Sequence, residues 1–161
     1  MTKSPARCLI LACGNSLRGD DGVGLWLAEW AEERFRIESD VRVVFRQQWT
    51  PELAEETACA ESVLFMDCSA ASPPGMVTLV QVSPALNKDG LATHFLGPAE
   101  LLGLGHEFYN SLPRTALLLT VGAGSTELGE TFSDVVQAAL PGACSLLEET
   151  VLNFLFLSKL A

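Results

Sequence analysis

The chain is short of basic residues. It has 10 lysines and arginines against 20 aspartates and glutamates, which gives a formal net charge of -10 over 161 residues. A nucleic-acid backbone or an anionic membrane surface is therefore an electrostatically poor partner, whereas a metal ion or a basic peptide is not. Apolar residues make up 48% of the chain, which excludes disorder, and the length fits one domain.

Targeting and disulfide signals are also missing. The apolar stretch behind the N-terminus runs into Gly14 and is too short for a signal peptide. The apolar segment 151–157 is interrupted by Asn153 and falls short of the ~20 residues of a membrane span. The five cysteines are odd in number and form no C-x-x-C pair, so we expect buried thiols and a cytoplasmic protein.

Several common catalytic signatures do not occur. The segment 122–126 lacks the second glycine of a G-x-S-x-G elbow, and the chain contains neither a P-loop nor an H-E-x-x-H sequence. A dinucleotide site is disfavoured because the strand ending near Phe45 is followed by Arg46 and two glutamines, not by a ribose-binding acid. These absences exclude the nucleotide and serine-hydrolase classes that an α/β chain most often suggests.

A glycine-rich turn is the most informative feature that is present. The apolar run 8–13 predicts a buried strand, and Gly14 to Gly24 follows it with Asp20 and Asp21 at the start of a predicted helix. Turns of this kind often bind phosphate through backbone N–H groups and the positive end of the helix dipole. Two adjacent carboxylates would repel such an anion, so the turn is suited to a cation.

Strands and helices alternate along the rest of the chain. We expect an α/β fold in which residues 1–161 form a single domain, a three-layer sandwich with a mostly parallel sheet and helices on both faces. The short connection before the strand 76–82 suggests antiparallel pairing with the preceding strand, at an edge of the sheet. Pro141-Gly142 should kink or divide the last helix. The expected strands are 8–13, 41–45, 62–66, 76–82 and 117–121, and the expected helices are 22–36, 50–59, 98–104 and 133–158.

Three side chains have the chemistry of metal ligands. They are Asp21 (or Asp20), Asp67 at the end of the strand 62–66, and His94 before a helix. Two carboxylates and an imidazole would hold a divalent transition ion and leave coordination positions open. Simpler roles remain open: Asp20 as a helix cap, Asp67 as a turn residue, and His94 as a surface residue. His106 is interpreted as structural.

The segment Gly14 to Gly24, the strand 63–67, Thr93-His94 and the strand end 119–122 together resemble the [NiFe]-hydrogenase maturation endopeptidases over nearly the whole chain. The resemblance implies a helix-covered parallel sheet and an enzyme that removes a C-terminal peptide from the hydrogenase large-subunit precursor after nickel insertion. It places the family's nickel-contacting and catalytic residues on Asp21, Asp67 and His94. Some members have Gly-Gly-Thr after the second strand, where this chain has Gln48-Trp49-Thr50-Pro51.

The leading hypothesis is therefore a nickel-dependent peptidase of a hydrogenase precursor that carries the nickel. A nickel-sensing or metallochaperone protein would use the same three groups only for binding, and a peptidase of the same fold could act on another protein. A ligating histidine must be neutral, so the resemblance predicts that activity falls as the pH drops through the region around 6.5.

Overall fold

A five-stranded sheet forms the centre of the protein in a computed structural model that describes residues 5–85 and 96–161. The spatial order is β2-β1-β3-β5-β4, with β1, β2, β3 and β5 parallel and β4 antiparallel to β5 at one edge. This confirms the predicted α/β fold with one antiparallel edge strand. The strands are β1 (Cys8–Cys13), β2 (Val41–Arg46), β3 (Ser62–Ser69), β4 (Val77–Gln81) and β5 (Thr115–Gly122).

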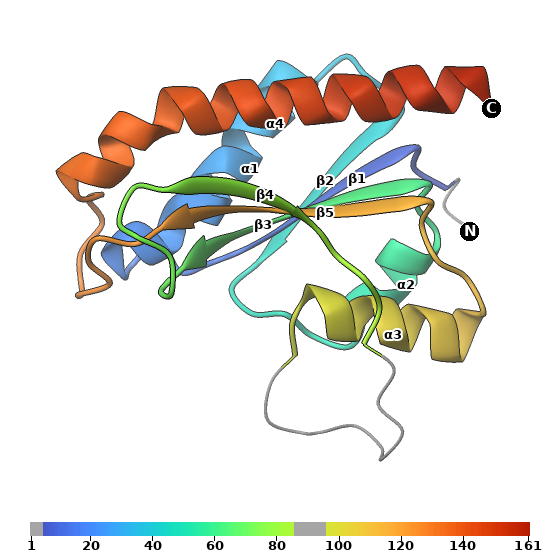
Figure 1. Cartoon of the computed structure of the whole chain (residues 1–161), viewed down its shortest axis with the longest axis horizontal. Helices are drawn as coiled ribbons and strands as arrows, with labels where there is room; N and C mark the ends of the chain where they lie inside the picture. Colours follow the sequence, from blue (N-terminus) through green and yellow to red (C-terminus); the bar gives the residue numbers. More distant parts are fainter. Residues whose placement is uncertain (1–4, 86–95) are drawn as a thin grey trace.

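Helices cover both faces of this sheet, as Figure 1 shows. The helices α1 (Val23–Arg34) and α4 (Asp134–Leu160) lie on one face, and α2 (Leu53–Ala58) and α3 (Pro98–Tyr109) lie on the other. A short 3-10 helix, η1 (Gly19–Gly22), leads directly into α1. The expected three-layer arrangement is therefore present.

The alternation of side chains along β1 divides the core in two. Cys8, Ile10 and Ala12 belong to the cluster that packs under α1 and α4. Leu9 and Leu11 point the other way, into the cluster under α2 and α3. Because all six residues of β1 are buried, the strand is apolar on both faces, as a central parallel strand must be.

The partner predicted for β4 is wrong. The strand pairs with β5, not with the preceding β3, because β5 lies between them. Thr78 and Thr120 face each other across this pair, with their hydroxyl oxygens 2.6 Å apart. The short connection between β3 and β4 suggests that these two strands are neighbours. Instead, the chain returns through α3 and places β5 next to β3, so that β4 lies on the outer side of β5.

The last helix is not divided at Pro141. The helix α4 runs without interruption for 27 residues, although Pro141 cannot donate the hydrogen bond of a mid-helix position. Ala143, Cys144 and Leu147 are buried immediately after the proline, and burial of this face stabilises the continuous helix. The helix α3 likewise continues past the predicted end at Leu104, because Gly105 allows close packing against Ala54 and Ala58 of α2.

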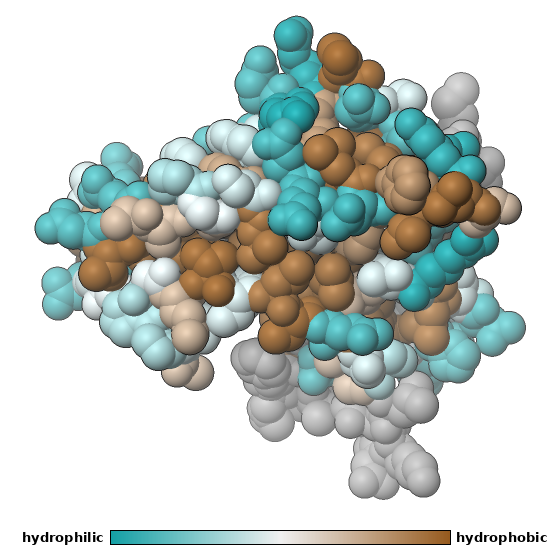
Figure 2. All heavy atoms as spheres, turned by 45° about the horizontal axis from the view of Figure 1, so that its top comes forward, coloured by the Kyte–Doolittle hydropathy of each residue, from teal (hydrophilic) through white to brown (hydrophobic). Residues whose placement is uncertain are grey.

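Because it is continuous, α4 is also longer than the apolar C-terminal segment that the sequence suggested. Among the described residues it is one helix that is long and apolar enough to cross a membrane by length and composition. One face of it, including Val136, Leu147, Val151 and Phe154, lies in the core. Figure 2 shows hydrophobic and hydrophilic side chains interspersed on this side of the molecule. A core helix passes the same test of length and composition, so this feature is weak evidence for a membrane.

Candidate active site

Close backbone packing brings the glycine-rich turn to the carboxyl ends of β1 and β3. A Cβ atom at Gly24 would lie 2.4 Å from the carbonyl oxygen of Cys13 and 3.5 Å from the Cα atom of Asp67. A Cβ atom at Gly14 would lie 2.3 Å from the carbonyl oxygen of Asp21. The distances to the two carbonyl oxygens are too short for a real side chain, so glycine at these two positions lets η1 and the start of α1 approach the sheet.

Asp20 is buried and fully engaged in a structural role. Its carboxylate accepts hydrogen bonds from the backbone N–H groups of Gly124, Ser125 and Ser133 at 2.7–2.9 Å, and from the Ser133 hydroxyl at 2.7 Å. Burial acts to raise the pKa of Asp20, but the hydrogen bonds from Ser133, Ser125 and Gly124 outweigh it and lower the pKa. Asp20 therefore joins η1 to the loop after β5 and to the start of α4, and has no role as the cap of α1.

Asp21 lies on the other side of the turn. It is half-buried, and its Oδ2 atom accepts a hydrogen bond of 3.1 Å from the backbone N–H of Asn15. Of the two adjacent aspartates, Asp21 is the one that keeps free carboxylate lone pairs, since one accepted hydrogen bond leaves most of them available. The structure thus separates two side chains that the sequence presented as interchangeable.

Asp67 lies in β3, two residues before the end of the strand, where it is paired with Thr120 of β5. Its Oδ1 atom accepts a hydrogen bond of 2.8 Å from the backbone N–H of Cys68, and its Oδ2 atom accepts one of 3.3 Å from the indole of Trp49. Burial, with a smaller contribution from the negative charge of Asp21, raises the pKa of Asp67 to about 6. The charge of Asp21 thus acts on Asp67, from the turn that follows β1.

Burial beside the charge of Asp21 makes the ionised form of Asp67 less favourable than it would be in water. A carboxylate that is desolvated beside a second carboxylate is unfavourable, and neutralisation by a proton or a metal ion relieves the cost. Within residues 5–85 and 96–161, no group of three histidine, cysteine, aspartate or glutamate side chains is arranged to hold a metal ion. Two carboxylates that each donate one oxygen fill only two positions of a tetrahedral or octahedral sphere, so further ligands would have to come from elsewhere.

Two cysteines flank the carboxylates. Burial, with the charges of Asp67 and Asp21, raises the pKa of Cys13 to about 12, and the same causes raise the pKa of Cys68 to about 12. Both thiols are therefore protonated at neutral pH and are poor nucleophiles. All five cysteines are free, but Cys59 is exposed, which corrects the expectation of buried thiols at that position.

Neither histidine is placed in the site by the described structure. The predicted ligand His94 lies outside the described residues. His106 is exposed in the last turn of α3.

Trp49 is a site residue that the sequence did not reveal. It lies in the connection between β2 and α2, in the segment that departs from the family's Gly-Gly-Thr, and its side chain reaches Asp67. The sequence signal that could have revealed it is the tryptophan in place of the family's glycine-rich segment. A large ring in the connection that follows β2 must pack near the end of that strand.

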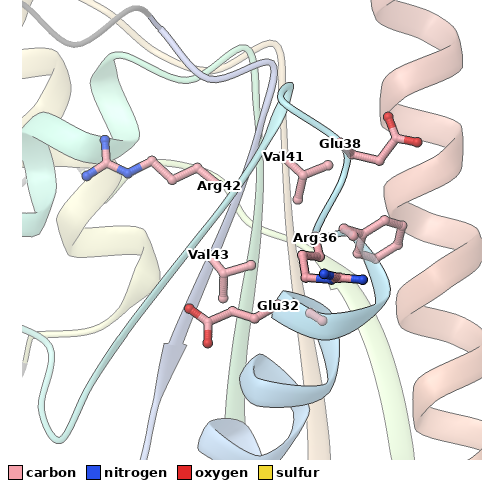
Figure 3. A pocket seen from close by; sticks show the side chains of 8 residues that line it. Glu32, Arg36, Glu38, Val41, Arg42 and Val43 are labelled. Atoms are coloured by element: carbon pink, nitrogen blue, oxygen red, sulfur yellow. The ribbon is translucent and has the colours of Figure 1, made fainter.

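An open pocket of about 350 Å³ lies far from these carboxylates. Figure 3 shows that it is lined by side chains from the end of α1 and the start of β2, among them Glu32, Arg36 and Val41. Val41 is paired with Cys8, the first residue of β1, whereas Asp21 lies in the turn that follows Cys13, the last residue of β1. The pocket therefore lies at the opposite end of the sheet from Asp21 and Asp67.

Comparison with solved structures relates this arrangement to one enzyme family. The [NiFe] hydrogenase maturation protease HybD from Thermococcus kodakarensis is 26% identical over 89% of this chain and 98% of its own, with a TM-score of 0.65. The maturation protease HycI from the same organism is 25% identical over 90% of each chain, also with a TM-score of 0.65.

The hydrogenase maturating endopeptidase HybD from E. coli has the same fold at 20% identity, with a TM-score of 0.67 over 91% of this chain and 93% of its own. No protein-family model and no curated protein sequence matches the chain. The predicted resemblance to hydrogenase maturation endopeptidases is confirmed by these structures, which also support the expectation of a peptidase.

Proposed function

We propose that this protein is an endopeptidase that removes the C-terminal extension of a [NiFe]-hydrogenase large-subunit precursor after nickel has been inserted. The observation that supports the proposal is that Asp21 and Asp67 both lie at the carboxyl-terminal edge of the sheet, where the start of α1 packs against Asp67 and the charge of Asp21 contributes to the raised pKa of Asp67. The pair occurs in a fold that the chain shares with proteins named as hydrogenase maturation proteases.

Nickel belongs to the substrate in this proposal. The ion arrives in the precursor, and Asp21, Asp67 and His94 contact it. Its positive charge would relieve the repulsion between Asp21 and Asp67, so a loaded precursor would bind better than an unloaded one. Binding then reports whether the metal has been inserted, and cleavage follows only on a loaded substrate.

The carboxylates fit this task better than the thiols beside them. Asp21 and Asp67 retain unshared lone pairs directed away from their backbone donors, whereas Cys13 and Cys68 are held protonated. Because all five cysteines are free in the structure, we also propose that the reaction takes place in the reducing cytoplasm.

Mass spectrometry of precursor incubated with the purified protein tests this function. We expect nickel-loaded precursor to be shortened at its C-terminus and nickel-free precursor to stay intact. A loaded precursor that binds the protein but is never cut would favour a nickel sensor or metallochaperone and would overturn the peptidase. Cleavage of other proteins but not of hydrogenase precursors would leave the peptidase and overturn the substrate.

A further inference from the structure

Trp49 makes a directed contact with a carboxylate of the candidate site. Its indole N–H donates to Oδ2 of Asp67 at 3.3 Å, while the backbone N–H of Cys68 donates to Oδ1. With one donor on each oxygen, the plane of the Asp67 carboxylate cannot turn about the Cβ–Cγ bond without losing a hydrogen bond. The donor on Oδ1 comes from the adjacent residue, so Trp49 is the donor that ties Asp67 to another part of the fold.

Other contacts hold the indole ring in place. The ring packs edge-on against Phe65 of β3, with the ring centroids 5.8 Å apart and the planes at 79°. The segment that carries Trp49 is attached to the end of β1, because the Cys13 thiol donates to the carbonyl oxygen of Gln47 at 3.4 Å. Trp49 is half-buried and adjoins the core cluster under α2 and α3. The position of the donor is therefore set by packing of its ring against β3 and by attachment of its segment to the end of β1.

We propose that Trp49 is a positioning residue that holds the carboxylate of Asp67 in the orientation in which it meets the substrate. The inference rests on the proposed function for what that substrate is, and on the hydrogen bond for the role itself. Each carboxylate oxygen has two lone pairs, so the bonds from Trp49 and Cys68 leave one on each oxygen for a cation. Fixing these lone pairs in advance avoids an ordering cost during the reaction.

The hydrogen bond can be tested without any activity. In a 15N–1H spectrum of the uniformly labelled protein, the indole signal of Trp49 is identified by its loss in Trp49→Phe. We expect Asp67→Ala to move this signal and to leave the indole signals of Trp26 and Trp30 in place. An unchanged Trp49 signal in folded Asp67→Ala protein would show that the bond is absent, and the proposal would be wrong.

The positioning role is tested by the kinetics of Trp49→Phe, which keeps an aromatic ring beside Phe65 but removes the donor. We expect kcat on nickel-loaded precursor to fall about 10-fold, since a hydrogen bond to a charged group is lost, while KM changes less than about 2-fold. Trp26→Phe, at an exposed position of α1, is the matched control and should behave as wild type. Wild-type kcat in Trp49→Phe would overturn the proposal.

A second substitution separates the donor from the shape of the ring. Benzothienylalanine introduced at position 49 has the outline of tryptophan with sulfur in place of N–H, so it should keep the packing against Phe65 and reproduce the loss of kcat. Wild-type kcat with this residue, together with a loss in Trp49→Phe, would mean that Trp49 only packs. Should wild-type protein fail to cut any precursor, the proposed function falls while the spectroscopic result still decides whether Trp49 holds Asp67.

Discussion

Two adjacent aspartates, Asp20 and Asp21, have opposite roles at the scale of single residues. Asp20 is buried under four donated hydrogen bonds, and Asp21 has one and lies near Asp67. The sequence could not distinguish them, because the partners of Asp20 lie more than 100 residues away in the loop after β5. It did predict that the turn after β1 and the end of β3 would lie at one edge of the sheet, because parallel strands have their carboxyl ends at the same edge.

Replacing Asp20 by Asn should destabilise the fold. An amide cannot accept all four hydrogen bonds, and its own NH₂ group would face a donor, so we expect unfolding in urea to show a loss of about 3 kcal/mol or more at pH 7. The loss should shrink as the pH falls below about 4, because the stabilising charge of Asp20, whose pKa is lowered by folding, disappears there.

Ser133→Ala is the control for Asp20→Asn, since it removes only the hydroxyl donor and should cost about 1 kcal/mol. Equal stabilities of Asp20→Asn and wild type at pH 7 would show that the buried carboxylate contributes nothing to the fold.

Replacing Asp67 by Asn should have the opposite effect on stability. The folded pKa of about 6 lies above the unfolded value, so the contribution of Asp67 to stability is most favourable below about pH 4 and is lost as the pH rises through 6. The amide avoids this penalty, and we expect Asp67→Asn to be more stable by up to about 3 kcal/mol at pH 8, with no gain at pH 3.5. Denaturant melts at the two pH values measure the difference.

A gain that is the same at both pH values would mean that the charge of Asp67 is not its source. A gain confined to high pH, together with lost processing, would mark Asp67 as a residue retained for function at the expense of stability.

At the scale of elements, two helical glycines show that tertiary packing decides whether glycine is required at a position. Gly142 follows Pro141 within α4, and a Cβ atom there would contact nothing within 4 Å. Gly24 begins α1 against the ends of β1 and β3, where a Cβ atom would collide with a carbonyl oxygen. Local sequence marks both as weak helix positions, but only the tertiary structure shows which one is required.

The same substitution at these two positions should therefore change stability in opposite directions. We expect Gly142→Ala to stabilise the protein by about 0.5–1 kcal/mol, because alanine has the higher helix propensity and meets no obstacle. Gly24→Ala should destabilise it by more than 1 kcal/mol through the forced separation of α1 from the sheet. Midpoints of chemical unfolding compare the two variants, and a destabilised Gly142→Ala would show that α4 is not a regular helix at this position.

Tertiary packing also explains why the sequence predicted the course of α3 and α4 poorly. Pro141 and Gly105 both signal a helix end locally, yet both lie within helices that bury an apolar face or pack closely on a neighbour. The strands β1, β2 and β5 were placed closely because their apolar runs end at turn residues. The neighbour of β4 could not be inferred, since strand order depends on a crossover through α3.

At the scale of the whole molecule, the fold was predictable from the sequence, and so was the edge of the sheet at which Asp21 and Asp67 lie. Alternating strands and helices indicate a parallel sheet, and the carboxyl ends of its central strands are the place where such folds gather functional side chains. The contribution of Trp49 was not predictable, because it depends on how a connection of six residues between β2 and α2 folds back over β3. The role of His94 stays a prediction.

The central claim is that Asp21 and Asp67 act together on the nickel-loaded precursor. Asp21→Ala tests it most directly, because Asp21 accepts a single backbone hydrogen bond and its removal should lower stability by only about 1 kcal/mol. The measurement is the rate at which the shortened large subunit appears by mass spectrometry with folded Asp21→Ala protein and loaded precursor. The account predicts that no shortened product forms, and wild-type processing by this variant would contradict it.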